Sequence, residues 1–171
     1  MRIVSGKFAG RDLTSPQDRR VRPTAENVRA GLLDMLHADL PNARVLELFA
    51  GTGAIGLEAI SRGALSADFV EFRPDSLHAL RANVAALRLR DRTRIFKRDA
   101  ILFAAALGPA SYDIVFADPP YGSRQLDRVI ESWRGCRFSR ILAVEHAVTH
   151  KLPAGTNWRV FDDTMVTIYT I

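Results

Sequence analysis

The segment Glu47 to Gly56, with the sequence ELFAGTGAIG, constrains the fold of this chain more than any other. Its glycines Gly51, Gly53 and Gly56 have the G-x-G-x-x-G spacing and stand between a β-rich run and a helical pattern. Gly51 and Gly53 allow a tight turn that a ligand can approach closely, and Gly56 allows close packing of the helix on the strand. The segment therefore predicts a strand, a tight turn and a helix within an open α/β sheet.

The chain after residue 43 alternates β-rich runs with helical patterns, which is typical of a parallel sheet flanked by helices. Helical patterns cover Ala54 to Arg62 and the stretch that begins at Pro74. The last two runs, 158–161 and 166–169, are separated by a short polar turn and predict an antiparallel hairpin. The five earlier runs are 45–49, 68–71, 93–96, 112–117 and 140–144. We therefore expect a Rossmann-like α/β fold with a mostly parallel seven-stranded sheet.

The 171 residues fit one domain, 1–171, in three parts. Residues 1–23 are expected to form a small basic N-terminal β-hairpin and a loop, and residues 24–40 a connecting helix that Thr24 caps. Residues 44–171 form the α/β core.

Basic residues exceed acidic ones, 24 to 19, for a net charge of +5. The excess is concentrated in two clusters, residues 1–24 and 88–98, each with six Lys or Arg. Clustered positive charge favours a polyanionic partner, although a solvated basic face would look the same in sequence.

The composition and the apolar runs of the sequence exclude several classes of protein. The balance of 47% hydrophobic and 25% charged residues excludes a disordered chain. No apolar run is long enough to span a bilayer, and the N-terminus does not resemble a secretory signal. Cys136 is the one cysteine, so an internal disulfide is impossible, and the histidines have no metal-ligand spacing. We expect a cytoplasmic protein with no membrane association and no metal.

Glu71 ends the β-rich run that follows the glycine turn, where related folds hold ribose hydroxyls with a carboxylate. A nucleoside-containing cofactor is therefore expected. Glu47, just before the glycines, would repel a pyrophosphate and favour a cationic ligand such as S-adenosylmethionine. Two alternatives stay open: Glu47 is a strand-end carboxylate that is solvated or bonded to backbone, or the turn binds a nicotinamide dinucleotide.

Asp118-Pro119-Pro120-Tyr121 follows another buried β-rich run, at the edge where open α/β sheets bind ligands. The prolines stiffen the turn, so the Asp118 carboxylate and a carbonyl near Pro119 can accept both hydrogens of a nucleobase amine. This localises the nitrogen lone pair, and Tyr121 can stack on the base. The alternative is a plain turn in which Asp118 caps the next segment and Tyr121 packs on a neighbour.

Asp99 and Ala100 follow the third β-rich run, where class I methyltransferases commonly contact adenine. Asp99 either accepts a hydrogen bond from the adenine amine or caps the helical pattern from Ala100 to Leu107.

The chain resembles the RsmD family of bacterial methyltransferases from end to end. The segments that carry the resemblance are Arg22-Pro23-Thr24 with Val28-Arg29, Leu46 to Gly53, Gly56 to Ala59, Ser61 to Ala64, Asp118 to Tyr121, and Val144-Glu145-His146. The resemblance implies a class I methyltransferase fold and transfer of a methyl group from S-adenosylmethionine to N2 of a guanine in 16S ribosomal RNA (rRNA) of the small subunit. The motif from Asp118 to Tyr121 would by itself equally allow adenine N6.

We assign each candidate residue to catalysis, to cofactor binding or to substrate binding. Asp118, Pro119 and Tyr121 are assigned to catalysis. The cofactor residues are Glu47, Phe49, Gly51, Gly53, Glu71, Asp99, Ala100 and Asp118. The substrate residues are Arg2, Lys7, Arg11, Arg22, Thr24, Pro120 and Tyr121. A monomer is expected.

One segment departs from the family. Where the family often has an aromatic-Gly-Asp-Thr turn, this chain has Phe161-Asp162-Asp163-Thr164. Asp162 can replace the glycine because aspartate tolerates positive φ better than most residues.

Three rival functions remain. They are a nicotinamide-dependent oxidoreductase, a methyltransferase of adenine N6 or protein glutamine, and a non-catalytic RNA-binding module.

Overall fold

The computed structural model describes residues 1–16 and 25–171, and in these ranges seven strands form one sheet in the order β3-β2-β1-β4-β5-β7-β6. The elements are α1 (Glu26–Met35), β1 (Arg44–Leu48), α2 (Ala54–Ser61), β2 (Ser66–Glu71), α3 (Pro74–Ala86), η1 (Arg90–Arg92), β3 (Thr93–Lys97), α4 (Ala100–Ala105), β4 (Tyr112–Ala117), α5 (Gln125–Cys136), β5 (Ser139–Ala147), β6 (Asn157–Phe161) and β7 (Thr164–Thr170). Strands β1 to β5 pair in parallel, whereas β7 is antiparallel to both of its neighbours. The mostly parallel sheet and its C-terminal hairpin confirm the sequence prediction.

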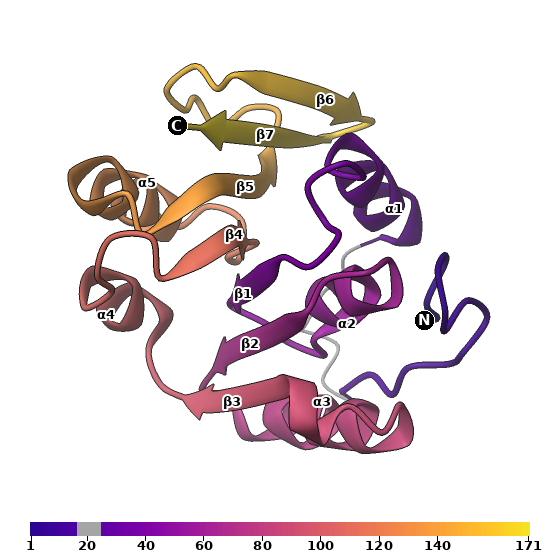
Figure 1. Cartoon of the computed structure of the whole chain (residues 1–171). Helices are drawn as coiled ribbons and strands as arrows, with labels where there is room; N and C mark the ends of the chain where they lie inside the picture. Colours follow the sequence, from indigo (N-terminus) through magenta and orange to yellow (C-terminus); the bar gives the residue numbers. More distant parts are fainter. Residues whose placement is uncertain (17–24) are drawn as a thin grey trace.

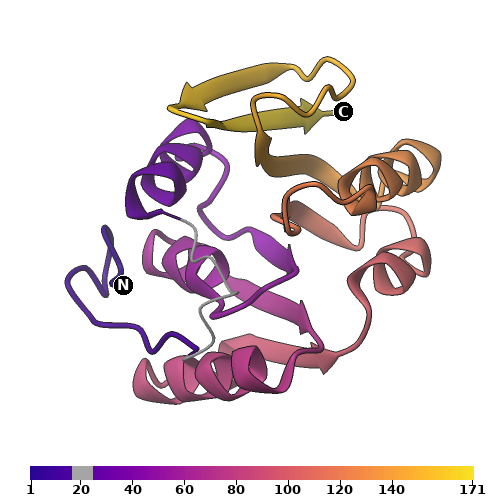
Figure 2. The same cartoon turned by 180° about the vertical axis from the view of Figure 1, so that it is seen from behind.

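Helices cover both faces of the sheet. Helices α1, α2 and α3 lie on one face, and α4 and α5 lie on the other (Figures 1 and 2). A hydrophobic core lies between the sheet and the helices on each face. Successive residues of a strand point to opposite faces, so Val45 of β1 packs in the core beneath α1, α2 and α3, and Leu46 packs in the core beneath α4 and α5. Because both faces are buried, the central strands are nearly continuous apolar runs, as parallel strands usually are.

The turn between β6 and β7 contains Asp162, which has φ of 53°. The expectation that aspartate can occupy a left-handed position at this turn is therefore confirmed.

The N-terminal segment forms a short version of the expected β-hairpin. Arg2 and Asp12 make an isolated antiparallel bridge, Ile3 N donates to the carbonyl of Arg11 at 2.9 Å, and Leu13 N donates to the carbonyl of Met1 at 2.8 Å. Gly6 and Gly10 have φ of 87° and 82°, so the segment turns twice. The loop between the two arms contacts α2, because Lys7 N donates to the carbonyl of Ser61 at 2.8 Å.

The helices also differ from their predictions: α2 ends at Ser61 rather than at Arg62, and α4 ends at Ala105 rather than at Leu107. Helix α1 ends at Met35 rather than at residue 40, and Thr24, its expected cap, lies outside the described residues. Helix α5 was not predicted, although Leu126, Val129, Ile130 and Trp133 are buried at helical spacing. None of the helices within 1–16 and 25–171 is long and apolar enough to cross a membrane.

Candidate active site

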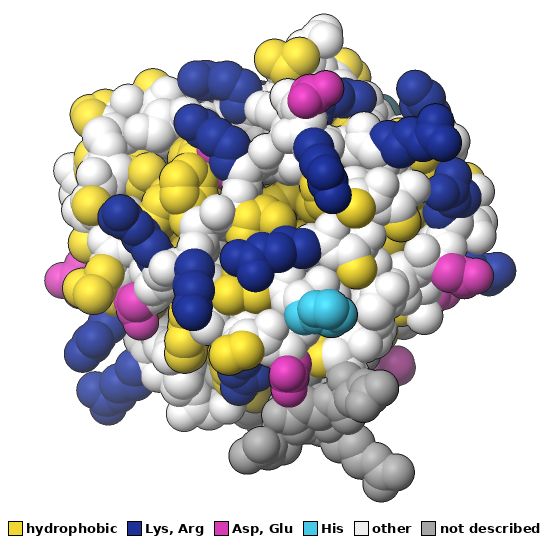
Figure 3. Space-filling model, turned by 90° about the horizontal axis from the view of Figure 1, so that it is seen from below, with side chains coloured by type: hydrophobic (Ala, Val, Ile, Leu, Met, Phe, Trp, Pro, Cys, Tyr) yellow, Lys and Arg dark blue, Asp and Glu magenta, His cyan; other side chains and the backbone are white. Residues whose placement is uncertain are grey.

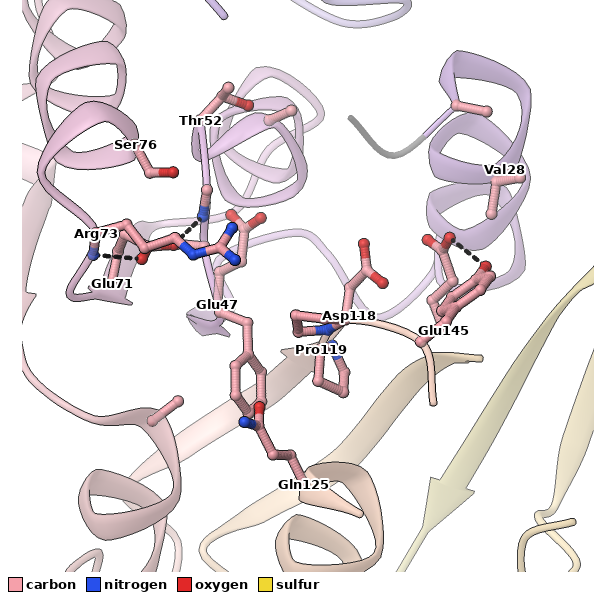
Figure 4. A pocket seen from close by; sticks show the side chains of 18 of the residues that line it. Val28, Glu47, Thr52, Glu71, Arg73, Ser76, Asp118, Pro119, Gln125 and Glu145 are labelled. Carbon is pink, nitrogen blue, oxygen red and sulfur yellow. Dashed lines mark hydrogen bonds between the residues drawn. The ribbon is translucent and has the colours of Figure 1, made fainter. Parts of the chain in front are cut away.

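A pocket of about 470 Å³ opens at the carboxyl ends of the central parallel strands. Glu71, Arg73 and Ser76 lie at one end, Glu47 and Asp118 near the middle, and Glu145 and Val28 at the other end (Figure 4). The volume is within the range of about 300–1,000 Å³ that small-molecule sites usually have. This edge of an open α/β sheet is where ligands of such folds bind.

The glycine turn forms the floor of the pocket between β1 and α2. Gly51 and Gly53 have φ of 55° and 76°, a region that other residues rarely adopt. Gly51 lines the pocket, and a Cβ there would meet no atom within 4 Å, so its backbone is open to a ligand. Gly53 does not line the pocket, and its Cβ would lie 2.3 Å from Leu80 Cδ1. Gly53 thus serves the turn and its packing.

Glu71 is buried at the end of β2 and accepts three backbone hydrogen bonds. Its Oε2 accepts from Gly51 N at 2.8 Å, and its Oε1 accepts from Phe72 N at 2.8 Å and Arg73 N at 2.9 Å. These bonds fix the carboxylate in one orientation at the pocket wall. A carboxylate has about four acceptor positions, so capacity remains for a ligand hydroxyl.

Glu47 lies beneath the turn, and its Oε2 accepts a hydrogen bond from Gly56 N at 2.8 Å. The backbone-bonded alternative is therefore observed, and the side chain also lines the pocket. Burial raises the pKa of Glu47 to about 8, and the negative charge of Asp118 adds to the rise. A cation in the pocket would favour the ionised form of Glu47.

The turn from Asp118 to Tyr121 follows β4 directly, and all four of its residues line the pocket. The Tyr121 hydroxyl donates to Glu145 Oε1 at 3.3 Å and lies 2.8 Å from Thr164 Oγ1. Burial raises the pKa of Tyr121 to about 12, with the negative charges of Glu145 and Asp118 contributing. The phenol therefore stays protonated and ties the turn to β5 and β7.

Asp99 is the N-cap of α4, because its Oδ1 accepts from Leu102 N at 2.9 Å. The side chain is exposed and does not line the pocket. The cap interpretation is the one observed. Ala100 and Phe49 do line the pocket, as expected of cofactor residues.

The basic residues proposed to contact substrate lie outside the pocket. The N–H of Arg2 donates to Glu26 Oε1 at 2.9 Å, Lys7 Nζ lies 5.7 Å from the centre of the Phe8 ring, and Arg11 donates to the carbonyl of Ala86 at 3.0 Å. Arg22 and Thr24 lie outside the described residues.

Sequence reasoning missed several residues that line the pocket. They include Phe72, Arg73, Ser76, Arg98, Gln125, Glu145 and the segment from Phe161 to Thr164. Phe72, Arg73 and Arg98 stand directly after predicted strands, so the strand-end rule was a sufficient signal for them. Ser76 is also buried, and its Oγ has no hydrogen-bond partner within the described part of the chain.

Similar solved structures share this fold over most of the chain. An Escherichia coli structure named as a methyltransferase, yhhF, has a TM-score of 0.84 and 32% identity and covers 99% of this chain and 97% of its own. An RNA methyltransferase from Salinibacter ruber, solved with S-adenosyl-L-homocysteine, has a TM-score of 0.68 at 18% identity and covers 88% of this chain and 94% of its own. The expected class I methyltransferase fold is confirmed.

Sequence comparison gives the family. Ribosomal RNA small subunit methyltransferase D of Escherichia coli strain K12 is 34% identical over 92% of this chain and 81% of its own length. A family model described as conserved hypothetical protein 95 matches residues 1–169. The chain therefore belongs to this family, which is the RsmD family that its motifs indicated.

Proposed function

We propose that this protein transfers a methyl group from S-adenosylmethionine to the exocyclic N2 amine of a guanine in 16S rRNA. Family membership supports a methyltransferase of small-subunit ribosomal RNA. The observation that carries the proposal is that two features line one pocket. The first is Glu71, a carboxylate placed to hold ribose hydroxyls, and the second is the turn from Asp118 to Tyr121, which can orient an amine. A nicotinamide-dependent oxidoreductase would leave that turn without a role.

The residues present fit S-adenosylmethionine. Glu71 would hold the ribose hydroxyls, and the open backbone at Gly51 would lie against the cofactor. Glu47, Asp118 and Glu145 place carboxyl groups along the pocket, which favours a sulfonium and an ammonium group. Phe49 and Ala100 add apolar surface. The bound cofactor supplies an electrophilic methyl group.

The Asp118 turn would position the target amine. Two consecutive prolines fix its backbone, so the Asp118 carboxylate and the carbonyl near Pro119 can accept the two amine hydrogens. This releases the nitrogen lone pair from the ring and directs it at the methyl carbon. Attack by the nitrogen would form the C–N bond while the bond between the methyl carbon and sulfur breaks and leaves its electron pair on sulfur. The proton lost from nitrogen would pass to Asp118 or to water. No covalent enzyme intermediate and no metal take part.

Substrate binding requires a base that is unpaired or flipped out of its helix, because the pocket cannot admit a stacked pair. The Tyr121 ring, whose hydroxyl is held by Thr164 and Glu145, would stack on that base with Pro120 beside it. Arg2, Lys7 and Arg11, with Arg22 and Thr24, would contact the RNA backbone. We propose that the enzyme acts as a monomer in the cytoplasm on an assembled or assembling small subunit.

The choice of guanine N2 over adenine N6 rests on the resemblance to the family. The test is transfer from radiolabelled S-adenosylmethionine to small-subunit particles that lack the modification, followed by nucleoside analysis. We expect N2-methylguanosine, and a loss of about 100-fold or more in rate for Asp118→Ala.

Asp113→Ala is the matched control. Asp113 lies at the opposite end of β4, where it pairs with Arg44 at 3.2 Å outside the pocket. The control should keep most of the activity. N6-methyladenosine or a methylated protein as the product would refute the guanine assignment, and equal activity of the two variants would refute the role of Asp118.

A further inference from the structure

One side of the molecule, formed by α3 and the edge strand β3, carries a group of exposed cations. Figure 3, which views the molecule from this side, shows Lys and Arg side chains outnumbering Asp and Glu over the described surface. We call this surface the α3–β3 face. Apart from Arg94, which pairs with Asp68, its exposed basic residues are Arg73, Arg81, Arg88, Arg90, Lys97 and Arg98. Between residues 73 and 98 the acidic side chains are Asp75 and Asp91.

The cations of the α3–β3 face do not stabilise the fold by ion pairs. Within residues 1–16 and 25–171, none of these six side chains forms a salt bridge. Two neighbouring arginines behave differently. Arg92 donates to the carbonyls of Leu65 and Ala64, and Arg94 pairs with the buried carboxylate of Asp68 at 2.6 Å. The face therefore combines arginines that hold the fold with six cations that remain available to a ligand.

The face is continuous with the candidate active site. Arg73 and Arg98 line the pocket itself, at its β2 and β3 side. Arg81 is exposed on α3, and Arg88 is exposed just beyond the C-terminal end of the helix, after its C-cap residue Leu87. At the far end of α3, Arg11 donates to the carbonyl of Ala86. With 13 residues at about 1.5 Å each, α3 extends the cationic surface roughly 20 Å from the pocket.

We propose that the α3–β3 face binds the sugar–phosphate backbone of the ribosomal RNA that carries the target base. The proposal rests on the function proposed above and adds the surface by which the substrate is held. Arginines contact phosphates well because the guanidinium group can bind two phosphate oxygens at once. A polyanion that enters the pocket at Arg73 and Arg98 meets six exposed cations on this face against three exposed carboxylates, Asp75, Asp91 and Asp99.

A simpler explanation covers part of the face. Charged side chains on an edge strand such as β3 prevent pairing with another chain, which accounts for Lys97. It does not account for Arg81 and Arg88, which lie on a helix and at its end. These two residues therefore test the proposal best.

The experiment compares two double variants that each remove two positive charges. The test variant is Arg81→Gln with Arg88→Gln. The control is Arg128→Gln with Arg134→Gln, since both residues are exposed on α5, which covers the opposite face of the sheet. Binding of small-subunit ribosomal RNA is measured by fluorescence anisotropy across a salt series. We expect the test variant to bind about tenfold more weakly, with a salt slope reduced by about 1.4 to 1.8, and the control to match the wild type.

Other outcomes would overturn the proposal. Equal weakening of both variants would mean that only net charge matters. Unchanged RNA binding together with lost binding to phosphatidylserine vesicles would make this a membrane surface instead. Calorimetry with S-adenosylmethionine should give the same affinity for all three proteins. The identity of the methylated product, analysed separately, decides the proposed function whichever way the RNA comparison falls.

Discussion

At the scale of single residues, Glu47 is a carboxyl group whose charge the fold strongly disfavours. Burial raises its pKa to about 8 in the folded protein, well above the usual value near 4.3 for an unfolded chain. Between those two values the folded state binds a proton that the unfolded state releases. The free energy of unfolding contributed by Glu47 is therefore fully present below about pH 4 and is lost as the pH rises toward 8.

Replacing Glu47 by Gln tests this relation. The amide keeps an oxygen that can accept from Gly56 N but cannot ionise. We expect urea unfolding of the wild type to show a larger loss of stability between pH 5 and pH 8 than unfolding of Glu47→Gln. All other titrating groups are common to both proteins, so the difference isolates Glu47. Parallel pH profiles would contradict the raised pKa.

Gly56 gives a second test at this scale, because the third glycine of the motif is a packing residue here. A Cβ at Gly56 would lie 2.6 Å from Phe69 Cε1 and 3.0 Å from Glu47 Oε2. Although alanine favours helices over glycine by about 1 kcal/mol, overpacking typically costs 1–3 kcal/mol. We expect the net effect of Gly56→Ala to be a loss of up to about 2 kcal/mol in urea unfolding.

Gly135 in α5 is the matched control for that substitution. A Cβ there would meet no atom within 4 Å, so Gly135→Ala should be neutral or more stable by up to about 1 kcal/mol. Similar effects of the two alanines would show that helix propensity alone decides, and that Gly56 has no packing role.

At the scale of elements, a buried ion pair fastens the N-terminal segment and α1 to α2. Arg29 Nε lies 2.7 Å from Glu58 Oε2, and both side chains are fully buried. Glu58 also accepts from Val4 N at 3.2 Å and pairs with Arg62 at 2.8 Å, while Arg29 donates to the carbonyl of Arg2. The short N-terminal hairpin is thus held by α1 and α2.

Breaking this pair should be costly. Glu58→Gln leaves the Arg29 guanidinium buried without its counter-charge, and we expect a loss of about 3–5 kcal/mol in urea unfolding. The double variant Arg29→Met with Glu58→Leu removes both charges and should recover part of that loss. A double variant less stable than Glu58→Gln would mean that the remaining hydrogen bonds, and not the charge pair, hold these elements together.

Local sequence patterns predicted some of these elements and not others. Strands β1 to β5 and helices α2 and α3 were predicted because burial against the sheet requires apolar residues at a regular spacing. That spacing can be seen in the local sequence. Helix α5 has apolar residues at the same helical spacing, although it was not predicted. The attachment of the N-terminal hairpin to α2 could not be predicted, because the acceptors on Glu58 and Ser61 lie more than 50 residues away.

At the scale of the whole molecule, the pocket joins segments that only the completed sheet brings together. Glu47, Glu71 and Asp118 were predictable because carboxyl ends of parallel strands meet at one edge. The hairpin tip at Asp162 and Asp163 was not predicted as pocket lining. It reaches the pocket because β7 pairs antiparallel with β5, which places Thr164 beside Ala147 at the end of β5. Gln125, the first residue of α5, also lines the pocket, and this helix was not predicted.

Because the pocket exists only when the sheet is complete, a ligand that binds there stabilises the entire fold. S-adenosylmethionine at about 100 times its Kd should add about 2.7 kcal/mol to the free energy of unfolding, or a rise of roughly 5–10 °C in Tm for a domain of this size. Glu71→Gln should lose most of this rise, because the amide places N–H donors among the backbone donors that now bind the carboxylate.

Tyr121→Phe is the control for that thermal shift. It removes the hydroxyl bonded to Thr164 and Glu145 but none of the groups proposed to hold the cofactor. Its own Tm should fall, because those bonds join the Asp118 turn to β5 and β7, yet its rise on adding S-adenosylmethionine should equal that of the wild type. If Glu71→Gln kept the full rise while Tyr121→Phe lost it, the cofactor would be held at the Tyr121 end of the pocket, and the assignment of the two ends would have to be reversed.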